Sequence, residues 1–268
     1  MSIVVIITGA SEGIGRALAK CFARDGARLV LAARNEERLR ELTVECKALG
    51  AAGALALKVD VTRSEDCRMM VERTIAEFGQ LDILVNNAGI TMWAKFSDMT
   101  DPSLASKVMD VNFMSSVYGT YFALPHLIKT RGRLVVVSSL AGLIGVPGHS
   151  VYGASKHALH GFINSLRIEV APAGVSCTIV APDFVVTEIH DRGLAADGKK
   201  MGRRLDPKRY MSAETCAELI HSGVMARKRL VLTSLRGHLA ARFRDWIPNW
   251  IADRLVSRHA KGSTMLNS

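Results

Sequence analysis

Residues 3–15 read Ile-Val-Val-Ile-Ile-Thr-Gly-Ala-Ser-Glu-Gly-Ile-Gly. The first five are a continuous apolar run rich in β-branched side chains, which predicts a strand buried on both faces of a parallel sheet. Glycines in the following turn let the backbone approach a diphosphate closely, and a helix from residue 13 would offer unpaired N–H groups there. The stretch therefore predicts a strand, a phosphate-binding turn and a helix.

The turn has the spacing G-x-x-x-G-x-G, which differs from the G-x-G-x-x-G fingerprint of many dinucleotide sites. Taken alone, it also fits a tight turn with a purely structural role. The candidate cofactor-binding residues in it are Gly9, Ser11, Glu12, Gly13, Ile14 and Gly15.

Strand and helix patterns alternate from this stretch to about residue 233. Further strands are expected at 29–31, 54–59, 83–85, 134–137, 175–180 and 230–232. Helices are expected at 13–24, 36–49, 64–78 with Ser64 as N-cap, over much of 101–129, at 151–171 and at 216–226. This order predicts an α/β fold, a Rossmann-type doubly wound parallel sheet with helices on both faces. We expect one catalytic domain over 1–233 and an extension over 234–268.

The second predicted strand ends at Ala32-Ala33-Arg34-Asn35. An acidic residue there would bind the adenosine ribose hydroxyls and favour NAD(H). Ala33 cannot do so, whereas the Arg34 guanidinium suits a 2′-phosphate. NADP(H) is therefore expected to be favoured over NAD(H), the alternative being that Arg34 is a solvated residue at a helix start.

Polar residues also follow the next two strands, with Asp60 after one and Asn86-Asn87-Ala88-Gly89 after the other. Ligands of such sheets bind beyond the carboxyl ends of the strands, so these residues are candidates for the same site. Tyr152 and Lys156 are four residues apart and share a helix face. An ammonium beside a phenol favours the phenolate and lowers the pKa of the tyrosine, which suits acid–base chemistry.

Five motifs follow one another along the chain. They are the glycine turn, residues 86–89, Asn112, Ser138-Ser139 and Tyr152…Lys156. The order and spacing of these motifs resemble those of the short-chain dehydrogenase/reductase family. The resemblance is close from residue 3 to about 187, and looser to 233. The resemblance implies an oxidoreductase that moves a hydride between a nicotinamide cofactor and a carbonyl or alcohol, without a metal.

The resemblance also implies roles for the catalytic residues. Tyr152 would give its proton to the substrate oxygen during reduction, and Ser139, chosen over Ser138 by its spacing to Tyr152, would hold that oxygen. Lys156 would bind the nicotinamide ribose and lower the pKa of Tyr152, and Asn112 would hold a water in a proton relay. Further cofactor contacts are implied for Asp60, Val61, Asn87, Ala88, Gly89, Pro182, Val185 and Thr187.

One position departs from the family pattern. After the sixth strand the family usually has Pro-Gly, whereas this chain has Pro182-Asp183. Val185 and Thr187 still match the positions that meet the nicotinamide carboxamide. The departure puts the geometry of the following loop, and of the substrate lid expected over 188–212, in question.

The whole net charge of +10 comes from the last quarter of the chain. Residues 1–198 contain 20 Lys and Arg and 20 Asp and Glu, whereas residues 199–268 contain 15 and 5. Within 236–258, apolar side chains including Trp246 and Trp250 recur at helical spacing between arginines. This segment could contact a membrane surface, cap the pocket or bury its apolar stripe at a dimer interface. It carries no nucleic-acid-binding motif, and we expect no nucleic acid partner.

Other features exclude further classes. The five cysteines are isolated, and no apolar stretch reaches the roughly 20 residues of a membrane span, so a cytoplasmic protein, peripheral at a membrane at most, is expected. His149, His157 and His160 lack the cysteine or carboxylate partners of a metal site. His149, with Met92 and Trp93, either lines the substrate pocket or packs in the core.

The expected activity is interconversion of a carbonyl and a secondary alcohol on a hydrophobic, lipid- or steroid-like substrate, by a homo-oligomer that is a dimer or tetramer. One alternative is a 3-oxoacyl thioester reductase, in which the basic quarter of the chain receives an acidic carrier or a phosphate. The other is a cofactor-binding scaffold without turnover at a membrane surface. Turnover of thioesters but not free ketones would indicate the first, and NADPH binding without turnover the second.

Overall fold

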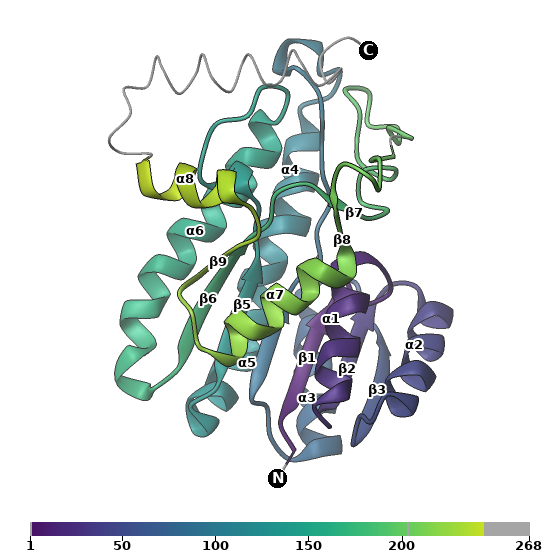
Figure 1. Cartoon of the computed structure of the whole chain (residues 1–268), viewed down its shortest axis with the longest axis vertical. Coiled ribbons are helices and arrows are strands. Elements are labelled where there is room, and N and C mark those ends of the chain that lie inside the picture. The colour runs from purple at the N-terminus through teal and green to yellow at the C-terminus, as the bar shows by residue number, and fades with distance from the viewer. Residues whose placement is uncertain (1, 203, 244–268) are drawn as a thin grey trace.

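The computed structural model describes residues 2–202 and 204–243. Within them, seven strands form one parallel sheet in the order β3-β2-β1-β4-β5-β6-β9 (Figure 1). These strands are β1 (Val4–Thr8), β2 (Arg28–Ala33), β3 (Gly53–Lys58), β4 (Ile83–Asn86), β5 (Arg133–Val137), β6 (Ser176–Ala181) and β9 (Leu230–Leu232). β7 (Val185–Val186) and β8 (Met211–Ser212) form a separate two-stranded parallel sheet that the sequence patterns did not predict.

Helices cover both faces of the large sheet. They are α1 (Gly13–Arg24), α2 (Glu36–Ala48), α3 (Ser64–Phe78), α4 (Ser103–Met109), α5 (Ser115–Thr130), α6 (Ser150–Val170) and α7 (Ala213–Met225). A further helix, α8 (Leu235–Phe243), lies beyond the carboxyl ends of the strands (Figure 1). Short segments are the 3-10 turns η1 (Phe96–Asp98), η3 (Leu140–Gly142) and η4 (Ala171–Ala173), and the π-helical turn η2 (Asp110–Met114). This architecture confirms the predicted doubly wound α/β fold.

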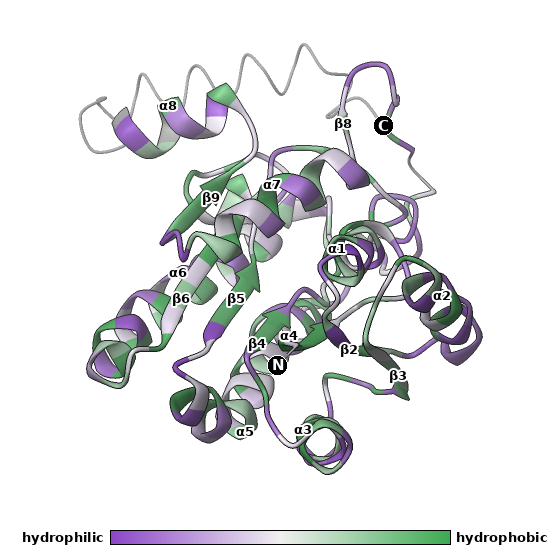
Figure 2. Ribbon diagram, turned by 60° about the horizontal axis from the view of Figure 1, so that its bottom comes forward, coloured by the Kyte–Doolittle hydropathy of each residue, from purple (hydrophilic) through white to green (hydrophobic). Residues whose placement is uncertain are grey.

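The central strands are buried on both sides, as the apolar run at the N-terminus predicts. Val5 and Ile7 belong to a core cluster with α1, α2 and α7, whereas Ile6 belongs to a second cluster with α3, α5 and α6. All three side chains are fully buried, and Figure 2 shows the hydrophobic interior of the sheet. Because successive strand side chains point to opposite faces, one short segment anchors both layers of helices.

The direction of strand succession reverses between β1 and β4, which are neighbours in the sheet. β2 and β3 lie on one side of this point, and β5, β6 and β9 lie on the other. In open parallel sheets, the crevice beyond the carboxyl ends of the strands at such a reversal is where ligands bind. The turns after β1, β4, β5 and β6 all open at that edge.

The helix from residue 64 begins where the sequence predicts, but Ser64 is not its N-cap. The cap is Arg63, whose backbone is extended, and Ser64 is already the first helical residue. Glu65 and Asp66 place two carboxylates in the first turn, where their negative charges interact favourably with the positive end of the helix dipole. Negative charge, with no hydrogen bond from a capping side chain, therefore marks the start of this helix.

The C-terminal extension is described only as far as residue 243. α8 is that part, and it lies beyond the carboxyl ends of the strands, above β9 and α6 in Figure 1. The apolar stripe predicted within 236–258 begins in α8 with Leu239, whereas its part from residue 244 on, with Trp246 and Trp250, lies outside the described residues. Among the helices of the described part, none is both long and apolar enough to cross a bilayer.

One buried hydroxyl joins the ends of the two strands at the reversal. The Thr8 Oγ1 atom accepts hydrogen bonds from the backbone N–H groups of Asn87 at 2.9 Å and Ala88 at 3.1 Å, and donates to the Val85 carbonyl at 3.3 Å. The side chain is almost fully buried. The turn after β4 is thus fixed on the end of β1.

We expect Thr8→Val to lower the free energy of unfolding by roughly 2 kcal/mol or more, because it leaves two buried N–H groups without an acceptor. Thr8→Ser is the matched control, since it keeps the hydroxyl and loses only a methyl group. Urea denaturation of both variants measures the difference. Equal stability of the valine and serine variants would show that these bonds do not hold the turn.

Candidate active site

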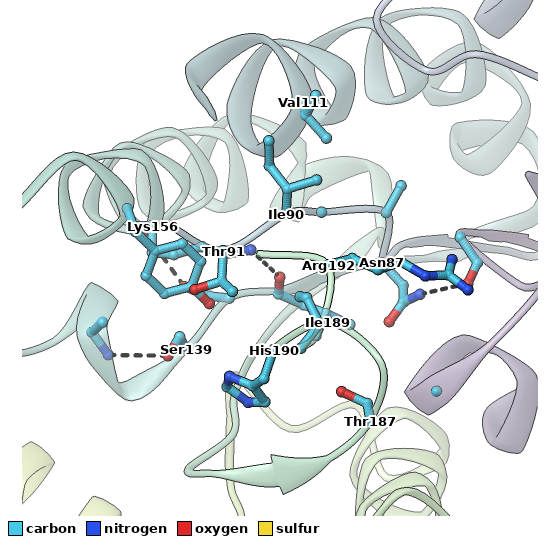
Figure 3. Close-up of a pocket in the computed structure, with 18 of the residues that line it drawn as sticks. Asn87, Ile90, Thr91, Val111, Ser139, Lys156, Thr187, Ile189, His190 and Arg192 are labelled. Atoms are coloured by element: carbon cyan, nitrogen blue, oxygen red, sulfur yellow. Dashed lines mark hydrogen bonds between the residues drawn. The ribbon is translucent and has the colours of Figure 1, made fainter. Parts of the chain in front are cut away.

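A single cavity of about 1920 Å³ lies beyond the carboxyl ends of the strands. The glycine turn, the turns after β2, β3, β4, β5 and β6, and the first turn of α6 all contribute to its wall. Figure 3 shows side chains from several of these segments, among them Asn87, Lys156 and Thr187, around one space. The fold thus brings the motifs of the sequence together, from Gly9 near the N-terminus to Thr187 after β6.

The glycine turn is packed so closely that side chains could not be added. Gly9 has a φ of +66°, and a Cβ atom there would lie 2.9 Å from the Cα of Ala88. A Cβ at Gly15 would collide with the carbonyl oxygen of Gly9 and with the Asn87 side chain. The glycines therefore let α1 start directly against the turn after β4.

The N-terminus of α1 has the features of an anion-binding site. Its N-cap residue, Glu12, has an extended backbone and makes no side-chain hydrogen bond to the first turn of the helix. Ser11, Glu12, Gly13 and Ile14 line the cavity at this point, while Gly15 is buried behind them. A helix N-terminus without a side-chain cap, facing a cavity, fits the diphosphate of a dinucleotide.

The Glu12 carboxylate is flanked by two arginines that the sequence patterns did not single out. Its Oε2 atom lies 2.9 Å from Arg38 of α2 and 2.5 Å from Arg192 of the segment after β7. Burial raises the pKa of Glu12, Glu188 adds to this, and the two arginines oppose it. Arg38 follows Arg34 by four residues, in the first turn of α2, whereas no sequence signal marked Arg192.

The end of β2 and the turn after β3 form one side of the cavity. Ala33 is buried and Arg34 is exposed, and both line the cavity with Asp60 and Val61. Burial acts to raise the pKa of Asp60, but hydrogen bonds from Thr62 and the charge of Arg34 hold it below its usual value. A guanidinium and a carboxylate thus lie near each other where the adenosine half of a dinucleotide would reach.

The turn after β4 runs along the middle of the cavity. Asn87, Ala88 and Gly89 line it, and the Asn87 side-chain amide donates to the Thr8 carbonyl at 2.9 Å. Gly89 lies between two other candidate residues: a Cβ there would be 3.1 Å from Asn112 Oδ1 and 3.6 Å from Lys156 Nζ. This short turn therefore connects the glycine turn with the residues of α6.

Asn112 lies in the π-helical turn η2 and is buried. Its side-chain Nδ2 donates to the Ile90 carbonyl and to the Ser155 hydroxyl, each at 3.0 Å, and its Oδ1 accepts from the Ile90 N–H at 2.8 Å. The amide ties the turn after β4 to α6. A π-turn shifts the side chains of a helix relative to a regular α-helix, and such turns occur often at functional sites.

Tyr152 and Lys156 lie one turn apart on α6 and face the cavity. The Lys156 Nζ atom donates to the Val137 carbonyl at 3.0 Å and lies 5.6 Å from the centre of the Tyr152 ring. Ser139 caps η3, where its hydroxyl accepts from the Ala141 N–H at 3.2 Å, and it also hydrogen-bonds Tyr152. Figure 3 shows Lys156 and Ser139 at the same end of the cavity.

The pKa of Tyr152 does not shift in the direction that the spacing predicts. Burial raises it to about 12, against a smaller lowering by the hydrogen bond with Ser139. Burial also lowers the pKa of Lys156 to about 8. The cost of removing both charged forms from water exceeds the effect of their proximity, so the expectation of a lowered tyrosine pKa is wrong for the protein alone.

The two adjacent serines after β5 have different surroundings. The Ser138 hydroxyl is buried and lies 3.0 Å from His160 Nε2 and 3.4 Å from the Lys156 carbonyl oxygen. Ser139 is more accessible and hydrogen-bonds the Tyr152 phenol. The first serine thus fastens β5 to α6, and the second is the one next to the phenol.

Aromatic residues line the part of the cavity near Tyr152. The His149 ring lies 5.3 Å from Tyr152 and 4.3 Å from Trp93, and Trp93 stacks on Phe184 at 6.2 Å, measured between ring centres. Met92 instead packs in a small core cluster, and its carbonyl lies 2.8 Å from His149 Nδ1. The sequence left the role of three residues open: His149 and Trp93 line the cavity, and Met92 packs in the core.

The segment after β6 closes the remaining side of the cavity. Pro182, Val185 and Thr187 line it, and the Pro182 carbonyl accepts from the Leu140 N–H at 3.0 Å. Thr187 faces the glycine turn, since a Cβ at Gly13 would lie 3.1 Å from its methyl group. Asp183 does not disrupt this course, and its own contacts run to the C-terminal segment.

Comparison with known proteins agrees with this architecture. The family model described as short chain dehydrogenase matches residues 3–196. A solved short-chain dehydrogenase/reductase from Burkholderia phymatum, in complex with NAD, is 26% identical with a TM-score of 0.79, covering 91% of this chain and 93% of its own. An alcohol dehydrogenase from Thermococcus sibiricus, complexed with 5-hydroxy-NADP, has a TM-score of 0.77 at 24% identity, covering 87% of this chain and 96% of its own, and shares the fold.

Among curated proteins, this chain is 37% identical over 253 residues to an 11-beta-hydroxysteroid dehydrogenase of Pinus massoniana, covering 92% of this chain and 71% of that protein. It is 41% identical over 228 residues to 11-beta-hydroxysteroid dehydrogenase-like 4A of Arabidopsis thaliana, covering 85% of this chain and 75% of that protein. A third relative, 11-beta-hydroxysteroid dehydrogenase-like 2 of Arabidopsis thaliana, is 43% identical over 186 residues, covering 69% of this chain and 60% of that protein. The chain therefore belongs to the short-chain dehydrogenase family, whose members are NAD(P)-dependent oxidoreductases acting on CH–OH groups.

Proposed function

We propose that this chain is an NADP(H)-dependent oxidoreductase that interconverts a carbonyl and a secondary alcohol on a hydrophobic, steroid- or lipid-like substrate. The observation that carries the proposal is the convergence of Tyr152, Ser139 and Lys156 on a cavity that continues to the glycine turn at the start of α1. Aromatic rings flank the phenol on the other side. The cavity thus provides an anion-binding end and an apolar end, with a proton-bearing group between them.

The residues of the cavity suit a dinucleotide. The helix N-terminus at Gly13 and Ile14 would hold its diphosphate, Asp60 and Val61 its adenine, and Lys156 and Thr187 its nicotinamide half. When bound, the nicotinamide supplies or accepts the hydride. Asn87, Ala88 and Gly89 line the path between the two halves.

The phenol of Tyr152 would be the proton donor in the reducing direction. Because its pKa is about 12, it is protonated at neutral pH and has a proton to give to a carbonyl oxygen. Ser139, which hydrogen-bonds the same phenol, is in position to hold that oxygen beside it. Asn112 would support the site by holding the turn after β4 against Ser155.

Lys156 would act on the state in which Tyr152 has lost its proton. With a pKa of about 8, the amine is mostly protonated at neutral pH, and it lies 5.6 Å from the centre of the phenol ring. A positive charge at this distance stabilises a phenolate more than a neutral phenol. The lysine therefore favours the product of proton transfer without ionising the tyrosine in advance.

The cofactor preference rests on the end of β2. Ala33 offers no carboxylate for the ribose hydroxyls, and Arg34 is exposed at the rim of the cavity near Asp60. A guanidinium forms strong charge-assisted hydrogen bonds with phosphate oxygens. These features support NADP(H) over NAD(H).

The apolar character of the substrate rests on the wall around Tyr152. Trp93, His149 and Phe184 form a connected set of rings there, with Tyr210 packed on Phe184 at 5.4 Å between ring centres. Flat aromatic surfaces suit a rigid apolar molecule. The curated relatives carry hydroxysteroid dehydrogenase names, which supports a steroid-like substrate.

The segment 188–212 would act as a lid on this cavity. Its Arg192 pairs with Glu12 beside the glycine turn, and Ile189 and His190 line the cavity (Figure 3). The ion pair therefore joins the lid to the cofactor side of the site. We place the catalytic domain at residues 1–233, with the lid as its substrate-facing part.

Tyr152→Phe is expected to lower kcat by about 100-fold or more, because it removes the proton donor and leaves the ring in place. NADPH binding, followed by fluorescence titration, is expected to remain unchanged. Tyr121→Phe is the matched control, since Tyr121 is exposed on α5 and does not line the cavity. Retained turnover in Tyr152→Phe would refute the donor role.

Arg34→Ala is expected to raise the KM for NADPH by about 10-fold or more and to leave the KM for NADH nearly unchanged, because only NADPH carries the 2′-phosphate. Arg40→Ala provides the comparison, since Arg40 is an exposed arginine of the same helical region that pairs with Glu36. Steady-state kinetics with each cofactor measure the effect. An equal loss for both cofactors would contradict the preference.

Lys156→Met is expected to change how stability depends on pH. Below pH 8 the folded protein buries a charged Lys156, whereas between pH 8 and about 10.5 the folded lysine is neutral while the unfolded one still binds a proton. The wild type should therefore gain about 3 kcal/mol in free energy of unfolding relative to the variant as pH rises across this window. Urea denaturation at pH 7.5 and at pH 10 tests this, and a constant difference would contradict the burial of the amine.

A further inference from the structure

Asp183 stands where the family pattern has a glycine, and its contacts lead to the C-terminal segment. Its Oδ2 atom accepts a hydrogen bond from the Ser234 hydroxyl at 2.8 Å, and its backbone N–H donates to Thr233 Oγ1 at 3.1 Å. The Arg236 guanidinium lies 3.9 Å from the same carboxylate oxygen. The side chain of Asp183 is 18% exposed, so these partners surround a half-buried charge.

Ser234 links this carboxylate to the start of α8. Its hydroxyl accepts from the Gly237 N–H at 3.1 Å while donating to Asp183, and its carbonyl accepts from the His238 N–H at 3.1 Å. One hydroxyl therefore both caps the first turn of the helix and fastens it to the turn after β6. The location of α8 depends on where Asp183 holds Ser234.

A second contact fixes α8 from the other side. Gly237 is buried, and a Cβ atom there would lie 2.9 Å from Leu140 Cδ2. Leu140 opens η3 and directly follows Ser139, the residue that hydrogen-bonds the Tyr152 phenol. The helix is thus seated between Asp183 and a residue adjacent to the proposed proton-donating pair.

The position of α8 makes it part of the cavity wall. Arg236 and Leu239, from its first two turns, line the same cavity as Tyr152 and Phe184. Leu239 is 49% exposed, so a large part of its apolar side chain is uncovered by protein. An apolar ligand that extends beyond the aromatic residues would cover this surface.

We propose that Asp183 is a positioning residue that docks α8 as the outer wall of the substrate pocket, and that this wall selects large apolar substrates over small ones. The selectivity rests on the proposed carbonyl–alcohol activity, whereas the docking does not. A glycine at position 183 keeps the backbone bond to Thr233 but has no carboxylate for Ser234 or Arg236. The departure from the family pattern is therefore what places α8 at the pocket.

Substrate kinetics on the full chain test the selectivity. With NADPH as cofactor, Asp183→Ala is expected to raise the KM for a tetracyclic steroid ketone by about 10-fold, the effect of losing one charge-assisted hydrogen bond. The KM for cyclohexanone, which is too small to reach α8 from the phenol, and the kcat for both ketones should change little. Ser234→Ala should reproduce this pattern, and the double variant should add little to either single one.

Trypsin cleavage after Arg236 tests the docking without requiring activity. Cleavage is expected to be several-fold faster in Asp183→Ala and Ser234→Ala than in the wild type, because release of α8 exposes the backbone. Asp98→Ala, which removes an exposed aspartate from η1, is the matched control and should cleave at the wild-type rate. Unchanged cleavage in both α8 variants would overturn the docking.

Two further results distinguish a failure of the selectivity from a failure of the proposed function. Equal increases in KM for the steroid ketone and for cyclohexanone would overturn the selectivity. Absence of turnover with every ketone would overturn the proposed function and the selectivity together. Faster cleavage in the two variants would then still support the docking of α8 by Asp183.

Discussion

The site depends on a half-buried phenol and a buried amine that lie at the same end of one cavity. The protein removes both side chains from water, which disfavours their charged forms and moves the pKa of Tyr152 up to about 12 and that of Lys156 down to about 8. At neutral pH, burial therefore keeps a proton on the tyrosine and leaves a mostly protonated amine 5.6 Å from the centre of its ring. Under the proposed function, this supplies both the donor and the charge that stabilises its ionised form.

The architecture brings these groups to the cavity through the strand reversal between β1 and β4. Thr8 fixes the turn after β4, Asn112 fixes that turn to α6, and the Ser138 hydroxyl bridges the end of β5 to α6. Each is a buried polar group whose partners lie far away in sequence. The residues proposed to be catalytic are thus positioned by a network of hydrogen bonds between strand ends, and α8 is joined to it through Asp183.

The features that could be predicted from the sequence were those that depend on residues close together in the chain. The apolar run before Thr8 marked the central strand, and the glycine turn marked its ligand-binding end, because strand burial and turn geometry depend on neighbouring residues. Contacts between distant segments left no such signal. The pairing of Glu12 with Arg192 and the docking of α8 on Asp183 each join segments more than 50 residues apart. The direction of the Tyr152 pKa shift was missed because spacing shows proximity to Lys156 but not burial.

Burial should keep the Tyr152 phenol protonated at pH values above the ordinary pKa of a tyrosine. The chain contains four tyrosines, so labelling their ring Cζ atoms with ¹³C gives four NMR signals, and Tyr152→Phe assigns the relevant one. A pH titration of the cofactor-free protein follows each phenol as it ionises. The Tyr152 signal should have moved only slightly by pH 11, since its pKa is about 12. A midpoint at or below pH 10 would contradict it.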